Sequence, residues 1–202
     1  MKGTETSPLR TQLLDAAEKL IRADGADAWT LAELAGGAGL GLDVVQAEFE
    51  TEWDAFCHVM RRDEERFEDV ILASSAESPS QRILALLEAC VPDFDWTFWI
   101  ELWSLAVRDE RASKLRSELD ERFRDLIEEM IRDGVEAGEF TVPDTRIAAI
   151  TIATLIDSMA HQVTLGDTTI RPNYMLDACV TVAGALLGAP LKLPALSEGD
   201  HD

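Results

Sequence analysis

The sequence TLAELAGGAGLGLDVVQAEFETEWDAF spans residues 30–56 and predicts a helix-turn-helix. Thr30 followed by Glu33 is a capping box, which starts a short helix. The small residues at positions 35–39 suit the tight turn between two closely packed helices. A second short helix is expected over residues 41–47, in the place of a recognition helix. This layout is typical of a DNA-binding module.

Two flanking helices complete the predicted N-terminal domain. Ser7-Pro8 supplies an N-cap and a first-turn proline, and Gly25 ends the helix that begins there. After the recognition helix, Thr51 caps a long fourth helix with Asp54 three residues further on. We therefore predict a helix-turn-helix domain over residues 1–50.

The remaining sequence predicts helices throughout. Prolines and glycines mark their ends, and apolar residues recur at three- and four-residue spacing. We predict an all-α fold with about nine helices, because alanine, leucine and glutamate are abundant and there is one tyrosine. The later helices are expected over residues 79–91, 95–107, 112–137, 143–165 and 172–187, and a polar tail over residues 191–202.

The charges of the helix-turn-helix oppose its layout. Between Thr30 and Phe56 there is no lysine or arginine, and the formal net charge of the whole chain is −21. Affinity for DNA comes largely from basic side chains that displace counterions, and in the recognition helix only Gln46 suits base readout. This stretch holds six acids: Glu33, Asp43, Glu48, Glu50, Glu52 and Asp54.

The order of the N-terminal motifs resembles the TetR family of bacterial regulators. The resemblance rests on Leu14-Asp15-Ala16-Ala17, Gly25, residues 30–35, Ala38-Gly39-Leu40 and Phe49. It implies a helical domain over residues 51–190 that binds an effector and dimerises. It places the DNA-contacting positions at Thr30, Gly41, Leu42, Gln46 and Thr51. The family usually has a lysine where this chain has Glu52.

Three tryptophans mark a candidate effector pocket. Trp96, Trp99 and Trp103 share one helix face, and with residues 134–140 they resemble the BetI-type branch of the family. The stripe is either plain core or the wall of a pocket for a small hydrophobic or cationic effector. On the pocket interpretation the candidate residues are Trp96, Trp99, Trp103, Phe123, Met130, Asp157 and His161.

The sequence favours a protein without catalytic or metal chemistry. Asp157 and His161 are four residues apart on one helix, so the histidine is either satisfied within an interface or available to a ligand. A metal site would need a third ligand that the sequence does not supply. No nucleophile motif, phosphate loop or dinucleotide fingerprint occurs. We expect no enzyme activity, no cofactor and no metal.

The last two helices predict an interface. Their broad apolar faces exceed what one covering layer needs, which favours a homodimer over a self-contained monomer core. The candidate dimer residues are Ile150, Thr154, Leu176, Cys179, Val182 and Ala183. No uninterrupted apolar stretch of membrane-spanning length occurs and no signal region opens the chain, so we expect a cytoplasmic protein without a membrane segment.

Two functional hypotheses follow. The first is a ligand-responsive transcriptional regulator, a repressor that binds double-stranded DNA as a dimer and is released by a small effector. The second is a protein of the same fold that has lost DNA binding and acts as a small-molecule-binding or protein-interaction module, such as an anti-repressor or a mixed-dimer partner. The framework residues favour the first hypothesis, and the acids favour the second.

Overall fold

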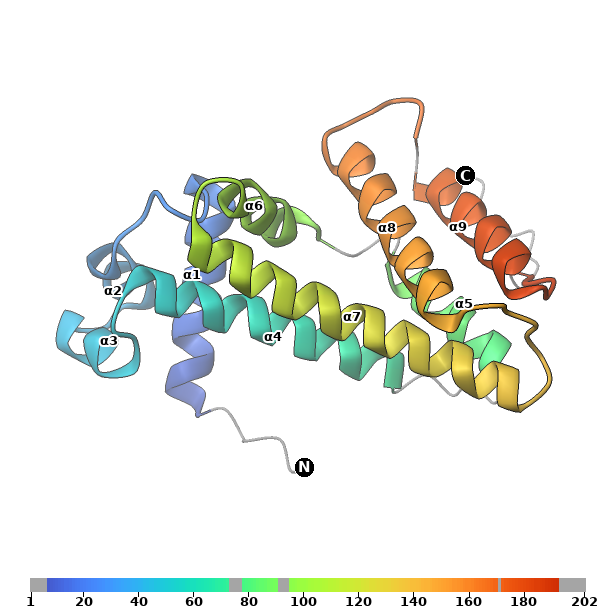
Figure 1. Ribbon diagram of the computed structural model, residues 1–202. Helices are drawn as coiled ribbons and strands as arrows, with labels where there is room; N and C mark the ends of the chain where they lie inside the picture. The colour runs from blue at the N-terminus through green and yellow to red at the C-terminus, as the bar shows by residue number, and fades with distance from the viewer. Residues whose placement is uncertain (1–6, 73–77, 91–94, 171, 193–202) are drawn as a thin grey trace, which may run out of the picture. The chain divides into compact units, whose positions relative to one another are not determined.

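The computed structural model describes residues 7–72, 78–90, 95–170 and 172–192. Within this part of the chain all regular structure is helical, in nine α-helices and no strand (Figure 1). Backbone contacts divide the chain into two compact units. Unit 1 comprises residues 1–68 and 95–117, and unit 2 comprises residues 69–94 and 118–202. The all-α prediction is therefore confirmed.

Unit 1 contains the helix-turn-helix. Its helices are α1 (Pro8–Asp24), α2 (Leu31–Ala38), α3 (Leu42–Glu48), most of α4 (Glu52–Leu72), α6 (Thr97–Ala106) and the start of α7 (Glu110–Glu136). The Oγ atom of Ser7 accepts a hydrogen bond from the backbone N–H of Arg10 (3.2 Å), which caps α1 as its sequence predicts. The core is formed by apolar side chains of successive helices, among them Leu13, Ile21, Leu34, Val45, Phe49, Phe56 and Met60.

Unit 2 contains α5 (Pro79–Ala89), α8 (Thr145–Thr164), α9 (Pro172–Leu187) and the remaining parts of α4 and α7. Helix α9 packs against both α8 and α5 (Figure 1). Ser78 and Gln81 form a capping box at the start of α5, and the Asp144 side chain accepts from the N–H of Ile147 at the start of α8. These local caps explain why the helices begin close to where the sequence predicts.

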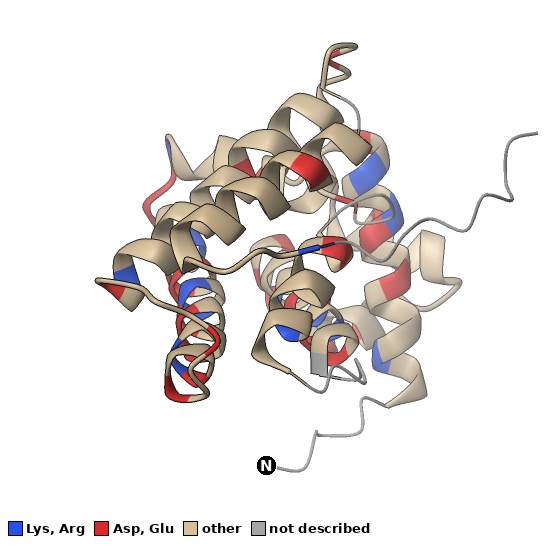
Figure 2. Ribbon diagram, turned by 90° about the vertical axis from the view of Figure 1, so that its right-hand side faces the viewer, with Lys and Arg blue, Asp and Glu red and all other residues tan. Residues whose placement is uncertain are grey.

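Helices α8 and α9 carry few charged residues (Figure 2). Among the described residues, α8 is the one helix whose length and mean hydropathy, 1.2, would suit a membrane span. A third of its most apolar stretch is buried inside the protein. Two of its apolar side chains remain accessible, Ile147 at 62% and Ile150 at 40%.

Helix ends differ from the expected ones by one or two residues. The recognition helix runs Leu42–Glu48 rather than over residues 41–47, because Gly41 serves as its N-cap. Helix α5 ends at Ala89, and Cys90 is its C-cap. The division into units passes through α4 and α7, so the boundary expected at residue 50 stays a prediction. The expected tail, residues 191–202, lies mostly outside the described residues.

Two glycine substitutions, one in each unit, test the packing inside that unit. Gly36 lies in α2 with nothing within 4 Å of the position that a Cβ would take, so Gly36→Ala removes only the helix penalty of glycine. We expect the free energy of unfolding to rise by about 1 kcal/mol. Gly134 lies in α7, where a Cβ would overlap the buried ring of Phe140. We expect Gly134→Ala to lower the free energy of unfolding by about 1–3 kcal/mol.

Urea unfolding followed by circular dichroism measures both changes, and the two variants control for each other because the chemical change is identical. A Gly134→Ala protein as stable as the wild type would show that Phe140 does not pack against that turn of α7.

Candidate functional site

The turn between α2 and α3 is built by backbone hydrogen bonds. Gly39 adopts the left-handed conformation (φ 67°) that L side chains rarely take, which ends α2. The N–H of Leu40 donates to the carbonyl of Ala35 (2.9 Å), and the N–H of Gly39 donates to that of Gly36 (3.2 Å). Helix α3 then begins after Gly41 and packs against α2. The sequence-predicted helix-turn-helix is thus present.

All five predicted DNA-contacting residues lie at the surface of unit 1. The exposed set is Thr30, Gly41, Leu42, Gln46 and Thr51. Val45 and Phe49, by contrast, are buried and anchor α3 to the core. The structure therefore separates a framework face of α3 from an outer face, and the role of the outer residues stays a prediction.

Several of the six acids bind the ends of the domain's own helices. The carboxylate of Glu52, at the start of α4, accepts the N–H of Leu31 in the first turn of α2 (3.0 Å). Glu33 closes the capping box of α2 by accepting both the N–H and the hydroxyl of Thr30 (2.9 Å each). Asp54 accepts the N–H of Glu50 (3.2 Å) before α4. Carboxylates at helix N-termini are stabilised by the helix dipole.

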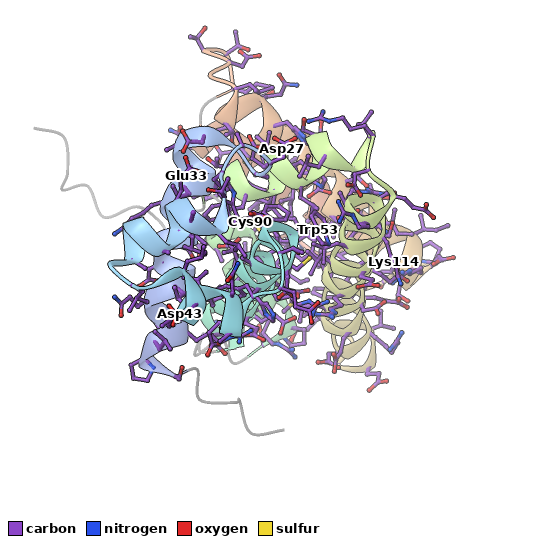
Figure 3. The ribbon with its side chains drawn as sticks, turned by 90° about the vertical axis from the view of Figure 1, so that its left-hand side faces the viewer. Asp27, Glu33, Asp43, Trp53, Cys90 and Lys114 are labelled. Atoms are coloured by element: carbon purple, nitrogen blue, oxygen red, sulfur yellow. The ribbon has the colours of Figure 1, made fainter. Side chains whose placement is uncertain are left out.

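Two further acids lie on α3. Asp43 stands in the first turn of the helix, and its carboxylate occupies the space that a side chain on Gly41 would need. Glu48, at the other end, pairs with Arg10 of α1 (3.0 Å). Figure 3 faces this end of unit 1 and labels Glu33 on α2 and Asp43 on α3. The acidity of the helix-turn-helix is therefore in large part structural.

Most arginines of unit 1 are also engaged by acids. Arg62 of α4 pairs with Asp15 (2.9 Å) and Glu18 of α1, and Arg66 pairs with Glu18 (2.8 Å). Lys19 and Arg61 are exposed. Residues 7–54 hold three basic and ten acidic side chains. Such a field slows the approach of DNA, and two N–H groups at the start of α2 that could bind a phosphate, those of Thr30 and Leu31, are already bonded to carboxylates.

The tryptophan stripe lies in unit 1. Trp96 and Trp103 stack with ring centroids 6.3 Å apart, and Trp99 is tilted against Trp103 at 6.4 Å. The indole N–H of Trp99 donates to the Asp63 carboxylate on α4 (3.1 Å). Burial raises the pKa of Asp63 to about 6, against the opposing effect of the Trp99 hydrogen bond. Trp96 is buried, whereas Trp99 and Trp103 are half-buried.

Helix α6 contacts α1 and the loop that follows α1. The guanidinium of Arg22, in the last turn of α1, lies 4.4 Å above the Phe98 ring and pairs with Asp95. The Glu101 carboxylate accepts the backbone N–H of Ala26 in the loop after α1 (3.1 Å). Helix α6 is therefore tied to α1 and to the loop that follows it within unit 1.

The other predicted effector residues lie in unit 2. Met130 is buried, and Phe123, Asp157 and His161 are half-buried. The Nδ1 atom of His161 lies 2.8 Å from the backbone carbonyl oxygen of Asp157, so Nδ1 carries the proton and donates. The seven predicted pocket residues thus fall into two groups, one in each unit, and their joint role stays a prediction.

The predicted dimer residues differ in exposure. Ile150 and Thr154 of α8 are exposed, Leu176 and Val182 of α9 are half-buried, and Cys179 and Ala183 are buried inside unit 2. Burial raises the pKa of the Cys179 thiol to about 11, so this cysteine is held in its neutral form. Among the described residues, no three acids, histidines or cysteines gather where they could hold a metal ion.

Sequence reasoning did not identify Asp63 or the role of Glu52. Asp63 is one of several acids on α4, and its partner Trp99 is 36 residues away. Glu52 caps a helix that begins 21 residues earlier in the chain. Both contacts depend on the tertiary fold, and no local sequence motif predicts either of them.

Family comparison identifies the C-terminal half. The family model of the BetI-type transcriptional repressor C-terminal domain matches residues 79–188, which is more than half of the chain. No curated protein is significantly similar in sequence.

Solved structures share the whole fold. A TetR-family regulator from Rhodococcus sp. is 16% identical, with a TM-score of 0.80, over 89% of this chain and 98% of that one. A TetR regulator from Haloarcula marismortui is 23% identical, with a TM-score of 0.78, over 89% and 98% of the two chains. A regulator from Saccharomonospora viridis, solved in complex with choline, is 21% identical, with a TM-score of 0.74, over 84% and 92%.

Proposed function

Because this chain belongs to the TetR family of transcriptional regulators, we propose that it is a ligand-responsive repressor. In this proposal it binds double-stranded DNA as a homodimer and leaves the DNA when a small effector binds. The observation that carries the proposal is the intact helix-turn-helix, whose outer residues Gln46, Thr30 and Thr51 remain exposed. Gln46 offers an amide that can read a base edge, and the hydroxyl of Thr51, which accepts from the Asp54 N–H, keeps its own proton to donate to a phosphate.

The proposed dimer uses α8 and α9. Ile147, Ile150 and Thr154 form an accessible row on α8 at helical spacing, and charged residues are scarce on both helices. Burying such a row against a second copy removes apolar surface from water. A dimer also supplies two recognition helices, which lets the protein span two half-sites of DNA.

The proposed effector is a small organic cation. Aromatic faces attract quaternary ammonium groups, and the buried carboxylate of Asp63 adds a negative charge beside Trp99. The Saccharomonospora regulator of the same fold was solved with choline. Effector binding at α6 would act on α1 through Arg22 and Glu101, which ties the ligand to the helix-turn-helix inside one unit.

Asp63→Asn tests the effector class, because the amide keeps an oxygen for the Trp99 N–H and removes the charge. We expect calorimetry with choline chloride to show binding that weakens on the order of tenfold in Asp63→Asn. In the wild type, binding should be strong above pH 6 and weaken as the pH falls through the Asp63 pKa of about 6. Glu65→Gln, at an exposed acid of the same helix, is the matched control. Equal affinities of the wild type and Asp63→Asn for choline would show that Asp63 does not contact the effector.

A second candidate function rests on the charge of the domain. The N–H groups of Thr30 and Leu31, at the start of α2, are bonded to Glu33 and Glu52, and acids outnumber bases by ten to three over residues 7–54. A domain in this state would keep the fold and lose DNA binding. It would then act as a small-molecule-binding protein or pair with another protein as an anti-repressor or mixed-dimer subunit.

Charge reversal at the interface separates the two functions. Glu52→Lys adds a cation where the family usually has lysine, but it removes the carboxylate that caps Leu31. Glu50→Lys adds a cation at an exposed residue nearby and leaves that cap in place. If the protein binds DNA, each should raise affinity for its own upstream DNA on the order of tenfold at low salt. Fluorescence anisotropy with labelled duplex measures the change.

Glu52→Gln and Glu65→Lys are the controls. The first keeps an acceptor for the Leu31 N–H and removes one negative charge, and the second makes the same charge reversal far along α4. If neither lysine at position 50 nor lysine at position 52 improves binding over Glu65→Lys, the interface has no DNA site to improve, and the second function is favoured.

A further inference from the structure

Arg10 of α1 contacts Glu48 at the end of α3 and His58 on α4. One guanidinium nitrogen, Nη1, pairs with the Glu48 carboxylate (3.0 Å), and the other, Nη2, lies 2.9 Å from the Nε2 atom of His58. The guanidinium also lies 5.5 Å above the ring of Phe49, and the His58 ring is 5.8 Å from the same ring. These contacts join three helices around the residue that ends the recognition helix.

The chemistry of this contact defines the state of His58. A guanidinium can only donate, so Nε2 must accept, and the imidazole is neutral with its proton on Nδ1. Burial is the largest influence that lowers the His58 pKa, and the positive charge of Arg10 lowers it further. Of the other charged groups, Arg61 also lowers it, whereas Asp54 and Glu48 raise it.

We propose that Arg10 and His58 form a proton-sensitive clamp that holds α3 against α1 and α4. A proton taken from solvent by Nε2 removes the acceptor for the Arg10 N–H and sets two cations side by side. The imidazolium then has an alternative partner in the Asp54 carboxylate, whose Oδ1 is 3.6 Å from Nε2. Arg10 keeps only its contacts to α3, and the link between α3 and α4 opens.

The clamp predicts a direction of pH dependence. Because the His58 pKa is lower in the folded protein than its ordinary value of 6.5, the unfolded chain binds more protons between the two values. Stability is therefore greatest above pH 6.5 and declines as the pH falls through the folded pKa. Asp63, whose pKa is raised, has the opposite effect, and only a comparison of variants isolates His58.

His58→Gln tests the clamp, because the Gln Oε1 accepts from Arg10 and does not titrate. We measure thermal midpoints of the wild type and the variant at about pH 7.5 and about pH 5.5. The thermal midpoint of the wild type should fall further between the higher and the lower pH than that of His58→Gln. Hydrogen exchange of the α3 amides, corrected for intrinsic rates, should accelerate at the lower pH in the wild type alone. His161→Gln, which makes the same substitution in unit 2, is the matched control.

A nuclear magnetic resonance titration decides the matter even if His58→Gln does not fold. In the wild type, the His58 C2 proton should titrate below pH 6.5, and Arg10→Gln should move this titration upward. A His58 that titrates at or above pH 6.5, or a His58→Gln protein with the wild-type pH profile, overturns the proposal. The measurements need neither DNA nor effector, so their result is independent of the proposed function.

Discussion

The bond from the Leu31 amide to the Glu52 carboxylate fixes the N-terminal domain. It joins the first turn of α2 to the first turn of α4, so the two helices that flank α3 in the sequence are tied together at their starts. A cap of this kind contributes on the order of 1 kcal/mol, and an acid is favoured there by the helix dipole. The same carboxylate takes a position where a DNA-binding domain gains from a cation. Stability of the fold and affinity for DNA therefore make opposite demands on this residue.

The opposition extends to the rest of the domain. Glu33 and Asp54 satisfy backbone donors at helix starts, and Glu48 engages Arg10. Arg62 and Arg66 are in turn held by acids of α1. What remains for a nucleic acid is an outer face centred on Gln46 that also carries the exposed acids Asp43 and Glu50, with Lys19 and Arg61 as exposed cations elsewhere in unit 1. Binding through such a face would release few counterions and would depend on fit more than on charge.

Local signals account for what the sequence predicts well. The Thr30–Glu33 capping box, the left-handed Gly39 and the Ser7 cap all lie within a few residues of the helix ends that they define. The site depends instead on contacts between distant residues. Trp99 bonds to Asp63, 36 residues away in the sequence, and Arg10 bonds to His58, 48 residues away. Such pairs depend on how helices cross, which the spacing of apolar residues along one helix does not predict. The sequence alone therefore suggests that the acids form a surface that repels DNA, although several of them cap helices.

On the proposed function, this acidic helix-turn-helix still binds DNA. Fluorescence anisotropy of the folded wild type, with its oligomeric state measured by sedimentation, against labelled DNA from its own upstream region at several salt concentrations is the measurement to make. We expect saturable binding to that DNA and not to a random duplex, with a salt dependence equivalent to about two to four phosphate contacts. Absence of binding to either duplex at the lowest salt would contradict it.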